Sequence, residues 1–391
     1  MKHSSIPFLD LKQQHAFLKP QLLQVFDAAL DTAGFIGGAQ VSSFETEFAA
    51  FCGNTEQRPV HCAGVGNGTD ALRLALLALG IGPGDLVLTV PNTFIATTEA
   101  ISHTGARFAF VDVDAETSLL DVALLERELT KRFATGKPED RPRAVIPVHL
   151  YGQCADMTAI MALAGRFGLK VVEDAAQAHG ATHNGQLAGS MGHAAGFSFY
   201  PGKNLGACGE AGAVTSTDAQ VIETVRMLRD HGQGKKYFHK LEGMNGRLDA
   251  IQAGFLRVKL PHLAGWNENR RSVCARYDAA FARLPWLSPV RILPGNVPSR
   301  HLYVAHVKAP AGREALAEAL KAQDIHTGLH YPHPLHLQEC YAGLGLGLGS
   351  FPVAERLARE LISLPLFPEM TPEQVERVIA AVLNFGNTLP A

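Results

Sequence analysis

The chain has 391 residues, more than one compact core usually holds, so its length predicts a large domain joined to a second one. Its 35 Lys and Arg residues and 37 Asp and Glu residues give a formal net charge of −2, which argues against a nucleic-acid partner because such a partner favours a basic face. A hydrophobic content of 47% is typical of a globular protein, and we expect neither a membrane span nor a secretion signal.

Between residues 44 and 260 the sequence alternates between helical and strand patterns. Apolar residues at helical spacing predict helices over 68–80, 93–105, 121–133 and 157–168, the last with Asp156 as its N-cap. Short apolar runs predict strands over 85–91, 107–114, 143–152, 169–175, 196–201 and 212–217. Because strands that alternate with helices are typical of a parallel sheet, we expect an α/β fold with a mostly parallel central sheet.

The pattern changes after this region. A long helix over 248–260 is interrupted at Pro261 and resumes over 266–284. A strand over 301–307 and helices over 313–323, 352–364 and 371–385 follow, with a glycine-rich loop at 343–350. We therefore predict a large domain over residues 1–265, which includes the N-terminal segment, and a smaller α+β domain over residues 266–391.

Lys203 and Asp174 carry the most chemical information. Lys203 lies in a glycine-rich stretch directly after a predicted strand, and Asp174 ends another one. A lysine presented in this way forms a Schiff base with an aldehyde, and an acid at the mouth of a buried strand holds a protonated ring nitrogen, as pyridoxal phosphate requires. The alternative interpretations are a solvated loop lysine and an acid that caps a turn. Gly206 and its neighbouring glycines favour a tightly folded loop that approaches other backbone closely.

Other residues extend this site. Gly68 and Thr69 open a predicted helix, whose N–H groups and dipole favour a phosphate, although such residues before a helix are usually only a cap. Strand alternation places Ser198 where its hydroxyl adds to the phosphate site. Phe94 follows a strand and either stacks on a flat ring or covers the core, and Gln177 lies near Asp174.

A metal centre and other catalytic classes have less support. His330, His333 and His336 are three residues apart, but the prolines between them exclude one helix face. The sequence has no HExxH, GxSxG, GxGxxG or Walker motif. The six cysteines lie far apart without a CxxC pair, so we expect reduced, mostly buried thiols in a cytoplasmic protein and no metal.

Seven stretches together resemble one family. They are GNGTDAL, VPNTFIAT, IPVHLYGQ, VEDAAQAHG, FSFYPGKNLGA, NGRLDAIQA and HYPHPLHLQ. In this order they resemble the PLP-dependent nucleotide-sugar aminotransferases of the DegT/DnrJ/StrS type, which have the aspartate-aminotransferase-like fold. The resemblance extends over nearly the whole chain, from IPFLDLKQQ to SLPLFPEMT.

The resemblance implies a role for each matching residue. It makes Lys203 the Schiff-base lysine, pairs Asp174 with the pyridinium nitrogen and places Gln177 near the ring hydroxyl. The phosphate is held by Gly68, Thr69 and Ser198, and Phe94 stacks on the ring. Members of the family are homodimers with shared active sites, so Asn245 is expected to reach the cofactor phosphate of the neighbouring subunit.

The substrate follows from the same resemblance. It implies transfer of an amino group from L-glutamate to C3 of a dTDP-3-keto-6-deoxyhexose, with Tyr331 and His336 as sugar or diphosphate contacts and His149 and Tyr151 as weaker candidates. Packing roles for these four residues remain equally open.

Departures and alternatives also follow from the comparison with the family. Cys208 and Glu210 stand where family members often carry tyrosine and aspartate. Relatives that act as sugar dehydratases have histidine in place of the lysine, so Lys203 argues against that activity. Amination at C4 of a UDP-, GDP- or dTDP-4-keto sugar, an enzyme of the same fold that acts on amino acids alone, and a non-catalytic nucleotide-sugar binder stay open.

Overall fold

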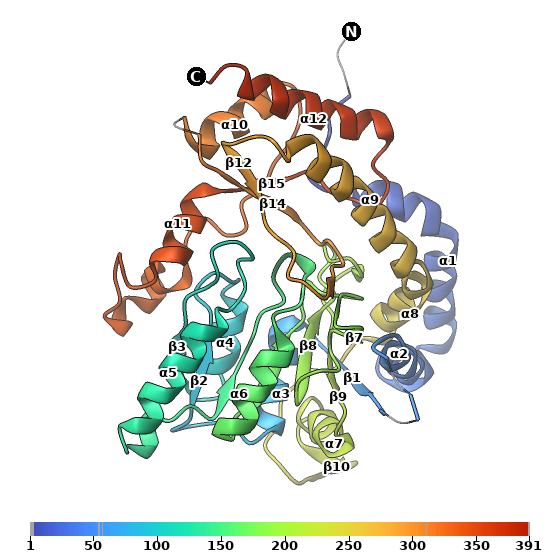
Figure 1. Cartoon of the computed structure of the whole chain (residues 1–391). Helices are drawn as coiled ribbons and strands as arrows, with labels where there is room; N and C mark the ends of the chain where they lie inside the picture. Colours follow the sequence, from blue (N-terminus) through green and yellow to red (C-terminus); the bar gives the residue numbers. More distant parts are fainter. Residues whose placement is uncertain (1–3, 54, 57, 310, 390–391) are drawn as a thin grey trace.

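The computed structural model describes residues 4–53, 55–56, 58–309 and 311–389, and a seven-stranded sheet forms its centre (Figure 1). The strand order is β1-β9-β8-β5-β4-β2-β3. The strands are β1 (His61–Val65), β2 (Leu86–Thr89), β3 (Arg107–Phe110), β4 (Ala144–Val145), β5 (Lys170–Asp174), β8 (Ala194–Ser198) and β9 (Gly212–Ser216). Strand β9 runs antiparallel to both its neighbours, whereas β8, β5, β4, β2 and β3 are parallel, so the predicted mostly parallel sheet is confirmed.

Helices cover both faces of this sheet because its strands are apolar on both sides. Successive residues of one strand enter different cores: Val171 faces one and Val172 the other. The core of Val172 includes residues of α3 (Gly68–Ala78), α4 (Ala96–Ser102) and α7 (Ala219–Leu228). The core of Val171 includes residues of α2 (Gly38–Phe51), α5 (Val122–Ala134), α6 (Met157–Phe167) and α8 (Ala250–Lys259).

Two N-terminal helices were not predicted from the sequence. Helix α1 (Leu11–Thr32) begins after Asp10, whose carboxylate accepts hydrogen bonds from the backbone N–H groups of Lys12 and Gln13. It packs on α8, and Figure 1 shows it along the right-hand edge of the molecule. Helix α2 then leads into β1.

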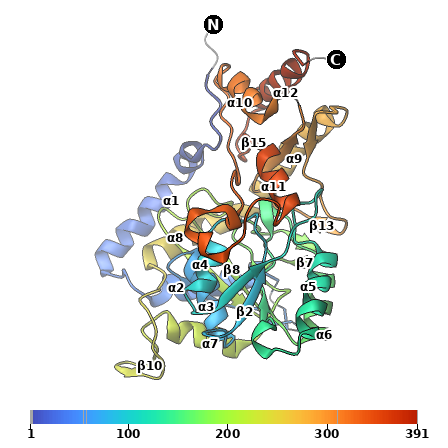
Figure 2. The ribbon, with the colours of Figure 1, turned by 90° about the vertical axis from the view of Figure 1, so that its left-hand side faces the viewer.

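A second, antiparallel sheet has its own core. It consists of β12 (Leu287–Pro289), β14 (Tyr303–Val307) and β15 (Leu361–Leu364), in that order. The core beside it contains residues of α9 (Leu263–Phe281), α10 (Gly312–Lys321) and α12 (Pro372–Gly386), and Ile6 joins it from the N-terminal segment. Figures 1 and 2 show this part at the end of the molecule where both termini lie. The boundary at residue 265 stays a prediction.

Two predicted elements are wrong in part. The helix predicted over 352–364 ends as α11 at Glu360, and its last four residues form β15, because they pair with β14 and are buried on both faces. The strand predicted over 143–152 is regular only at β4, since Pro147 has no N–H to donate and a 3₁₀ turn follows at Leu150–Gly152.

The remaining elements are short. A small sheet contains β13 (Asn296–Val297), β6 (Thr182–His183) and β7 (Gln186–Leu187), and a hairpin contains β10 (Gln233–Lys235) and β11 (Phe238–His239). The other 3₁₀ turns are Pro138–Asp140, Leu260–His262, Leu335–Leu337 and Glu339–Leu344. The N-cap predicted at Asp156 is confirmed, because its carboxylate accepts a hydrogen bond from the N–H of Ala159.

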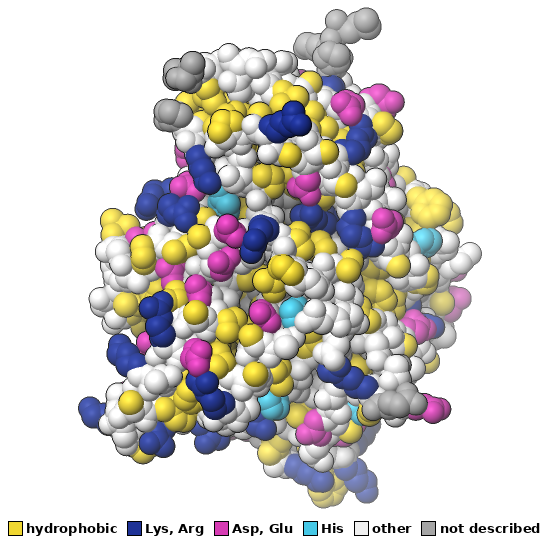
Figure 3. Space-filling model, in the orientation of Figure 1, with side chains coloured by type: hydrophobic (Ala, Val, Ile, Leu, Met, Phe, Trp, Pro, Cys, Tyr) yellow, Lys and Arg dark blue, Asp and Glu magenta, His cyan; other side chains and the backbone are white. Residues whose placement is uncertain are grey.

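The surface charges, the cysteines and the helix lengths can be compared with the predictions from composition. Acidic and basic side chains are interspersed over the face in Figure 3. All six cysteines are free thiols, four of them buried, with Cys208 and Cys340 exposed. Within the described ranges, no helix is both long and apolar enough to cross a bilayer. The cytoplasmic location stays a prediction.

Candidate active site

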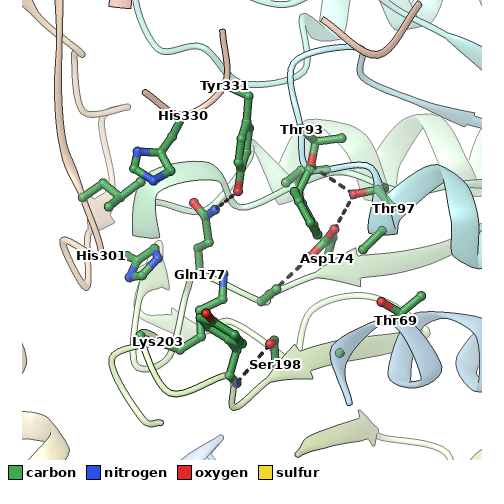
Figure 4. A pocket seen from close by; sticks show the side chains of 18 of the residues that line it. Thr69, Thr93, Thr97, Asp174, Gln177, Ser198, Lys203, His301, His330 and Tyr331 are labelled. Atoms are coloured by element: carbon green, nitrogen blue, oxygen red, sulfur yellow. Dashed lines mark hydrogen bonds between the residues drawn. The ribbon is translucent and has the colours of Figure 1, made fainter. Parts of the chain in front are cut away.

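The candidate site lies where the carboxyl ends of β5 and β8 meet. These neighbouring parallel strands end at Asp174 and Ser198, and the loops after them carry Gln177 and Lys203. Helix α3 begins beside these strand ends. The approach is so close that a Cβ on Gly68 would lie only 2.6 Å from Cβ of Ser198. Together these residues line a cavity of about 690 Å³ (Figure 4).

Lys203 is held at the cavity by a tightly folded loop. Its backbone N–H donates to the carbonyl of Tyr200 at 2.8 Å, and the amide of Asn204 donates to Asn267 and to the carbonyl of Ser299. The close approach predicted at Gly206 is confirmed, since a Cβ there would lie 2.2 Å from the carbonyl oxygen of Pro201. The loop thus fixes where the amine stands.

The amine of Lys203 and the carboxylate of Asp174 influence each other. Burial lowers the pKa of Lys203 to about 8, and the charge of Asp174 acts in the opposite direction. Burial raises the pKa of Asp174, although a hydrogen bond from Thr97 and the charge of Lys203 oppose this effect. An amine with a pKa near 8 is partly unprotonated at neutral pH and is therefore a competent nucleophile and base.

The start of α3 offers donors to an anion. The side chain of Asn67 caps the helix by accepting from the N–H of Asp70, which leaves the N–H groups of Gly68 and Thr69 without a partner among the described residues. The hydroxyls of Thr69 and Ser198 line the same wall. This set of donors fits a phosphate group.

Aromatic and amide groups complete the cavity. Phe94 is 55% exposed and its ring centroid lies 5.7 Å from that of Tyr331. The amide of Gln177 donates to the hydroxyl of Tyr331 at 3.1 Å, and its oxygen accepts from the N–H of Tyr151. A carboxylate, an amine, an exposed ring and a helix start with free N–H donors thus surround one space, and the chemistry of these groups fits pyridoxal phosphate.

Two predicted residues lie outside the cavity. Asn245 is exposed, next to Asp230, and does not line the cavity of its own chain. His336 is buried and its Nε2 lies 3.0 Å from Glu355, so the structure gives it a packing contact rather than a place at the cavity. Of the two weaker candidates, His149 is buried against Glu173, and the hydroxyl of Tyr151 donates to the carbonyl of His330.

Several cavity residues were not predicted from the sequence. Thr97 donates to Asp174 at 2.7 Å, as Figure 4 shows, and its spacing of four from Thr93 on a helix start was a usable signal. His301 and Arg270 also line the cavity, but nothing in the local sequence distinguishes them. No group of three or more potential metal ligands occurs in the part of the chain that the structure describes.

Comparisons with known proteins agree on one family. The sequence profile of the DegT/DnrJ/EryC1/StrS aminotransferase family matches residues 18–383. The chain is 42% identical over 384 residues to "Pleiotropic regulatory protein" of Geobacillus stearothermophilus, covering 97% of this chain and 98% of that protein. It is also 42% identical over 381 residues to the dTDP-3-amino-3,4,6-trideoxy-alpha-D-glucose transaminase of Streptomyces venezuelae, with 97% and 96% covered.

One solved structure is similar over the whole length. The crystal structure of S. venezuelae DesV in complex with a ketimine intermediate has a TM-score of 0.93 and 41% sequence identity to this chain. The likeness covers 99% of this chain and 100% of that one. The similarity therefore includes both sheets and the cavity between them.

Proposed function

Because the chain belongs to the DegT/DnrJ/EryC1/StrS aminotransferase family, whose members depend on pyridoxal phosphate, we propose that it transfers an amino group from L-glutamate to C3 of a nucleotide-linked keto sugar. The acceptor we propose is a dTDP-3-keto-6-deoxyhexose, since relatives over nearly the whole chain are named dTDP-3-amino-sugar transaminases. The observation that carries the proposal is that the half-buried Lys203 and the buried Asp174 line one cavity.

In this proposal different residues bind different parts of the cofactor. The N–H groups of Gly68 and Thr69 and the hydroxyls of Thr69 and Ser198 hold the phosphate. Asp174 holds the proton of the ring nitrogen, while Phe94 and Gln177 orient the ring. When bound, pyridoxal phosphate supplies an aldehyde and a ring that accepts an electron pair.

Lys203 is the base in this proposal. Its amine takes the proton from Cα of the amino donor, and a pKa of about 8 lets it both accept and return a proton near neutral pH. Tyr331 lines the cavity above Gln177, so its ring and hydroxyl are placed to orient the sugar. His336 is left out of the proposed substrate contacts because it is buried against Glu355.

We also propose that the active unit is a homodimer. Large apolar side chains are exposed along α1 and just after it: Phe17, Leu23, Phe26, Leu30, Phe35 and Ile36. Exposure on this scale favours an interface. Asn245, which is exposed and absent from its own chain's cavity, would then reach the cofactor phosphate of the partner.

The test uses the purified holoenzyme and the visible absorbance of its cofactor. L-Glutamate alone should remove the visible band, and a dTDP-3-keto sugar should restore it and yield a 3-amino sugar, identified by mass spectrometry and NMR. Lys203→Ala should abolish both reactions. The control Lys321→Ala changes a lysine on the surface of α10, paired with Glu318, and should leave both reactions unchanged.

The acceptor panel decides between the alternatives. It contains dTDP-3-keto, dTDP-4-keto and UDP-3-keto sugars. Restoration of the band by a 4-keto sugar only would contradict amination at C3. Conversion by glutamate without turnover of any sugar would contradict the sugar acceptor, and the absence of any spectral response to glutamate would contradict the amino donor.

A further inference from the structure

The cavity contains one cation that the proposed cofactor contacts do not use. Its lining has two basic side chains, Lys203 and Arg270, and two acidic ones, Asp174 and Glu210. The negative charge of Asp174 interacts with the positive charge of Lys203, and the side chain of Glu210 is exposed to solvent. Arg270 comes from α9 and is only 3% exposed. A charged group this deeply buried calls for a partner.

The guanidinium of Arg270 has only neutral partners. Its Nη1 donates to the carbonyl oxygen of Leu366 at 3.0 Å and to that of His301 at 3.5 Å. Its Nε has no hydrogen-bond partner, and no carboxylate of the described residues lies within 4 Å of the group. Two carbonyl oxygens leave the positive charge uncompensated and several N–H donors free.

The guanidinium keeps its charge at neutral pH. Burial lowers the pKa of Arg270 to about 10, and the charge of Glu369 opposes that effect. Glu369 acts from beyond ion-pair distance, and one of its own carboxylate oxygens is buried without a partner. Arg270 is therefore a cation that the chain itself does not neutralise.

His301 connects Arg270 to the loop that carries Lys203. The Nδ1 of His301 lies 3.0 Å from the amide oxygen of Asn204, the residue after Lys203, and the carbonyl of His301 accepts from Arg270. The pKa of His301 lies well below its ordinary value because of burial, followed by the charges of Lys203 and Arg270. Figure 4 shows His301 beside Lys203 at the cavity.

We propose that Arg270 binds a carboxylate of the amino donor and so places its Cα within reach of Lys203. The inference rests on the proposed function, because it needs an amino-acid donor in this cavity. In the proposed function Lys203 binds the cofactor and acts as the base. Arg270 is then the other Lys or Arg side chain in the cavity lining, and it is free to bind the donor. Planar guanidinium groups bind carboxylates through paired hydrogen bonds, which matches the free N–H donors of Arg270.

The test separates the donor and acceptor half-reactions of the holoenzyme. Arg270→Gln should raise the dissociation constant for L-glutamate at least about 10-fold, the loss expected for a charged hydrogen bond, and leave the KM for the keto sugar within about twofold. Arg270→Lys, which keeps the charge and one donor, should fall between. The matched control is Arg271→Gln, since Arg271 lies on the exposed side of α9 paired with Glu268 at 2.6 Å.

Binding without turnover gives a second measurement. Glutarate carries two carboxylates but no amine, so its dissociation constant, measured by calorimetry, should rise in Arg270→Gln and stay unchanged in Arg271→Gln. Comparing L-glutamate with L-alanine then identifies the carboxylate. A loss for both donors indicates the α-carboxylate, and a loss for glutamate alone indicates the side-chain carboxylate.

Two results would overturn the inference. One is a wild-type enzyme that reacts with glutamate while Arg270→Gln binds glutamate and glutarate equally well. The other is an equal loss toward donor and acceptor in Arg270→Lys, which would make Arg270 a clamp on the carbonyls of Leu366 and His301. A wild-type enzyme that ignores glutamate would instead contradict the proposed function.

Discussion

Hydrogen bonds favour the ionised form of the buried carboxylate of Asp174, which can then pair with a cation. Its Oδ2 accepts from the hydroxyl of Thr97 at 2.7 Å, and its Oδ1 accepts from the N–H of Ala176 at 3.2 Å. Because the hydroxyl of Thr97 donates its hydrogen to Asp174, the hydroxyl of Thr93 is the donor in the 3.0 Å contact between the two threonines. Burial favours the protonated acid, and these bonds favour the carboxylate.

Removing the hydroxyl of Thr97 should weaken catalysis through Asp174. Thr97→Val deletes a bond that lowers the pKa of Asp174, so the acid limb of the kcat–pH profile should move to higher pH. We expect kcat to fall about 10-fold, the effect of one hydrogen bond to a charged group. Thr97→Ser should restore both properties, because it keeps the hydroxyl.

The neighbouring threonine provides the control for this experiment. Thr98 bonds the carbonyl of Ile95 and the hydroxyl of Tyr341, away from Asp174. Thr98→Val should leave the pH profile in place. Identical profiles for Thr97→Val and Thr98→Val would refute a role of Thr97 in the ionisation of Asp174.

The low pKa of Lys203 is the second prediction at this scale. In protein freed of cofactor, labelling of Lys203 by an amine-reactive probe should reach half its maximal rate at about pH 8. Asp174→Asn should lower this midpoint, because the charge of Asp174 raises the pKa of Lys203. Mass spectrometry of the labelled peptide measures the midpoint. Labelling of the surface residue Lys321 serves as the reference for the pH dependence of the probe.

The same pKa has a consequence for stability. Because the folded-state pKa of about 8 lies below the ordinary 10.5, the unfolded chain binds the proton more tightly. The contribution of Lys203 to stability therefore rises between these two values, and Lys203→Met should lack this rise in its unfolding free energy. A labelling midpoint near 10.5 would show that the amine is not buried as described.

At the scale of elements, Glu173 fastens β5 to the turn that precedes β8. Its carboxylate accepts from the backbone N–H groups of Gly189, Met191 and Gly192 and from Nε2 of His149. The Nδ1 of His149 accepts from the N–H of Ala155, which assigns the ring proton to Nε2. These bonds outweigh burial and lower the pKa of Glu173.

Glu173→Gln should destabilise the fold strongly. The amide would turn N–H donors toward backbone N–H groups, so buried donors would lose their acceptor at a cost of about 3 kcal/mol. Urea unfolding measures the loss, and Glu339→Gln, at an exposed position, is the control. A change below about 0.5 kcal/mol would contradict the fastening role.

Glu173 also gives the fold an acid limit. Its folded-state pKa lies below the ordinary value of 4.5, so its contribution to stability is present above pH 4.5 and is lost as the pH falls through the folded value. The Glu173→Gln protein should lack this acid-dependent loss. Unfolding measurements on both proteins across this range test the sign.

The sequence could predict the central sheet because local pattern and fold agree there. Val171 and Val172 alternate into two cores, and the glycines around Lys203 indicated the close backbone approach found at Gly206. Residues 361–364 were misread because three apolar residues and one serine continue a helical pattern, and only pairing with β14 makes them a strand. Local pattern does not contain that pairing.

The same limit applies to the site. The sequence could bring Asp174, Ser198 and Lys203 together because the first two end neighbouring strands and Lys203 follows one of them, and the sheet determines where those ends meet. Arg270 escaped prediction because it lies within a helix, and its place depends on how α9 meets the carbonyl groups of Leu366 and His301. His336 was misplaced for the same reason, since its burial against Glu355 depends on a contact with α11.

At the scale of the whole molecule, the cavity belongs to the junction of two cores. The ends of the central strands form its floor, while Arg270, His301 and Leu366 close it from the side of the second sheet. Such junctions are common ligand sites.

The last prediction concerns assembly. Leu23, Phe26 and Leu30 are spaced by three and four residues, so they share one face of α1, and Leu23 and Leu30 are 56% and 55% exposed. The double variant Leu23→Glu, Leu30→Glu places two charges on this face, which should oppose contact with a second apolar face. Sedimentation should then report the mass of one chain, 41.9 kDa, where the proposed wild-type dimer should have twice that mass.

Loss of the dimer should also weaken cofactor binding, because the exposed Asn245 would no longer reach the partner's phosphate site. Asn245→Ala should reproduce this weakening while the protein stays dimeric, which separates contact from assembly. Leu348→Glu is the control, since Leu348 is 78% exposed on a loop far along the chain from α1. A double variant that remains dimeric, or a wild-type protein with the mass of one chain, would remove α1 as the interface.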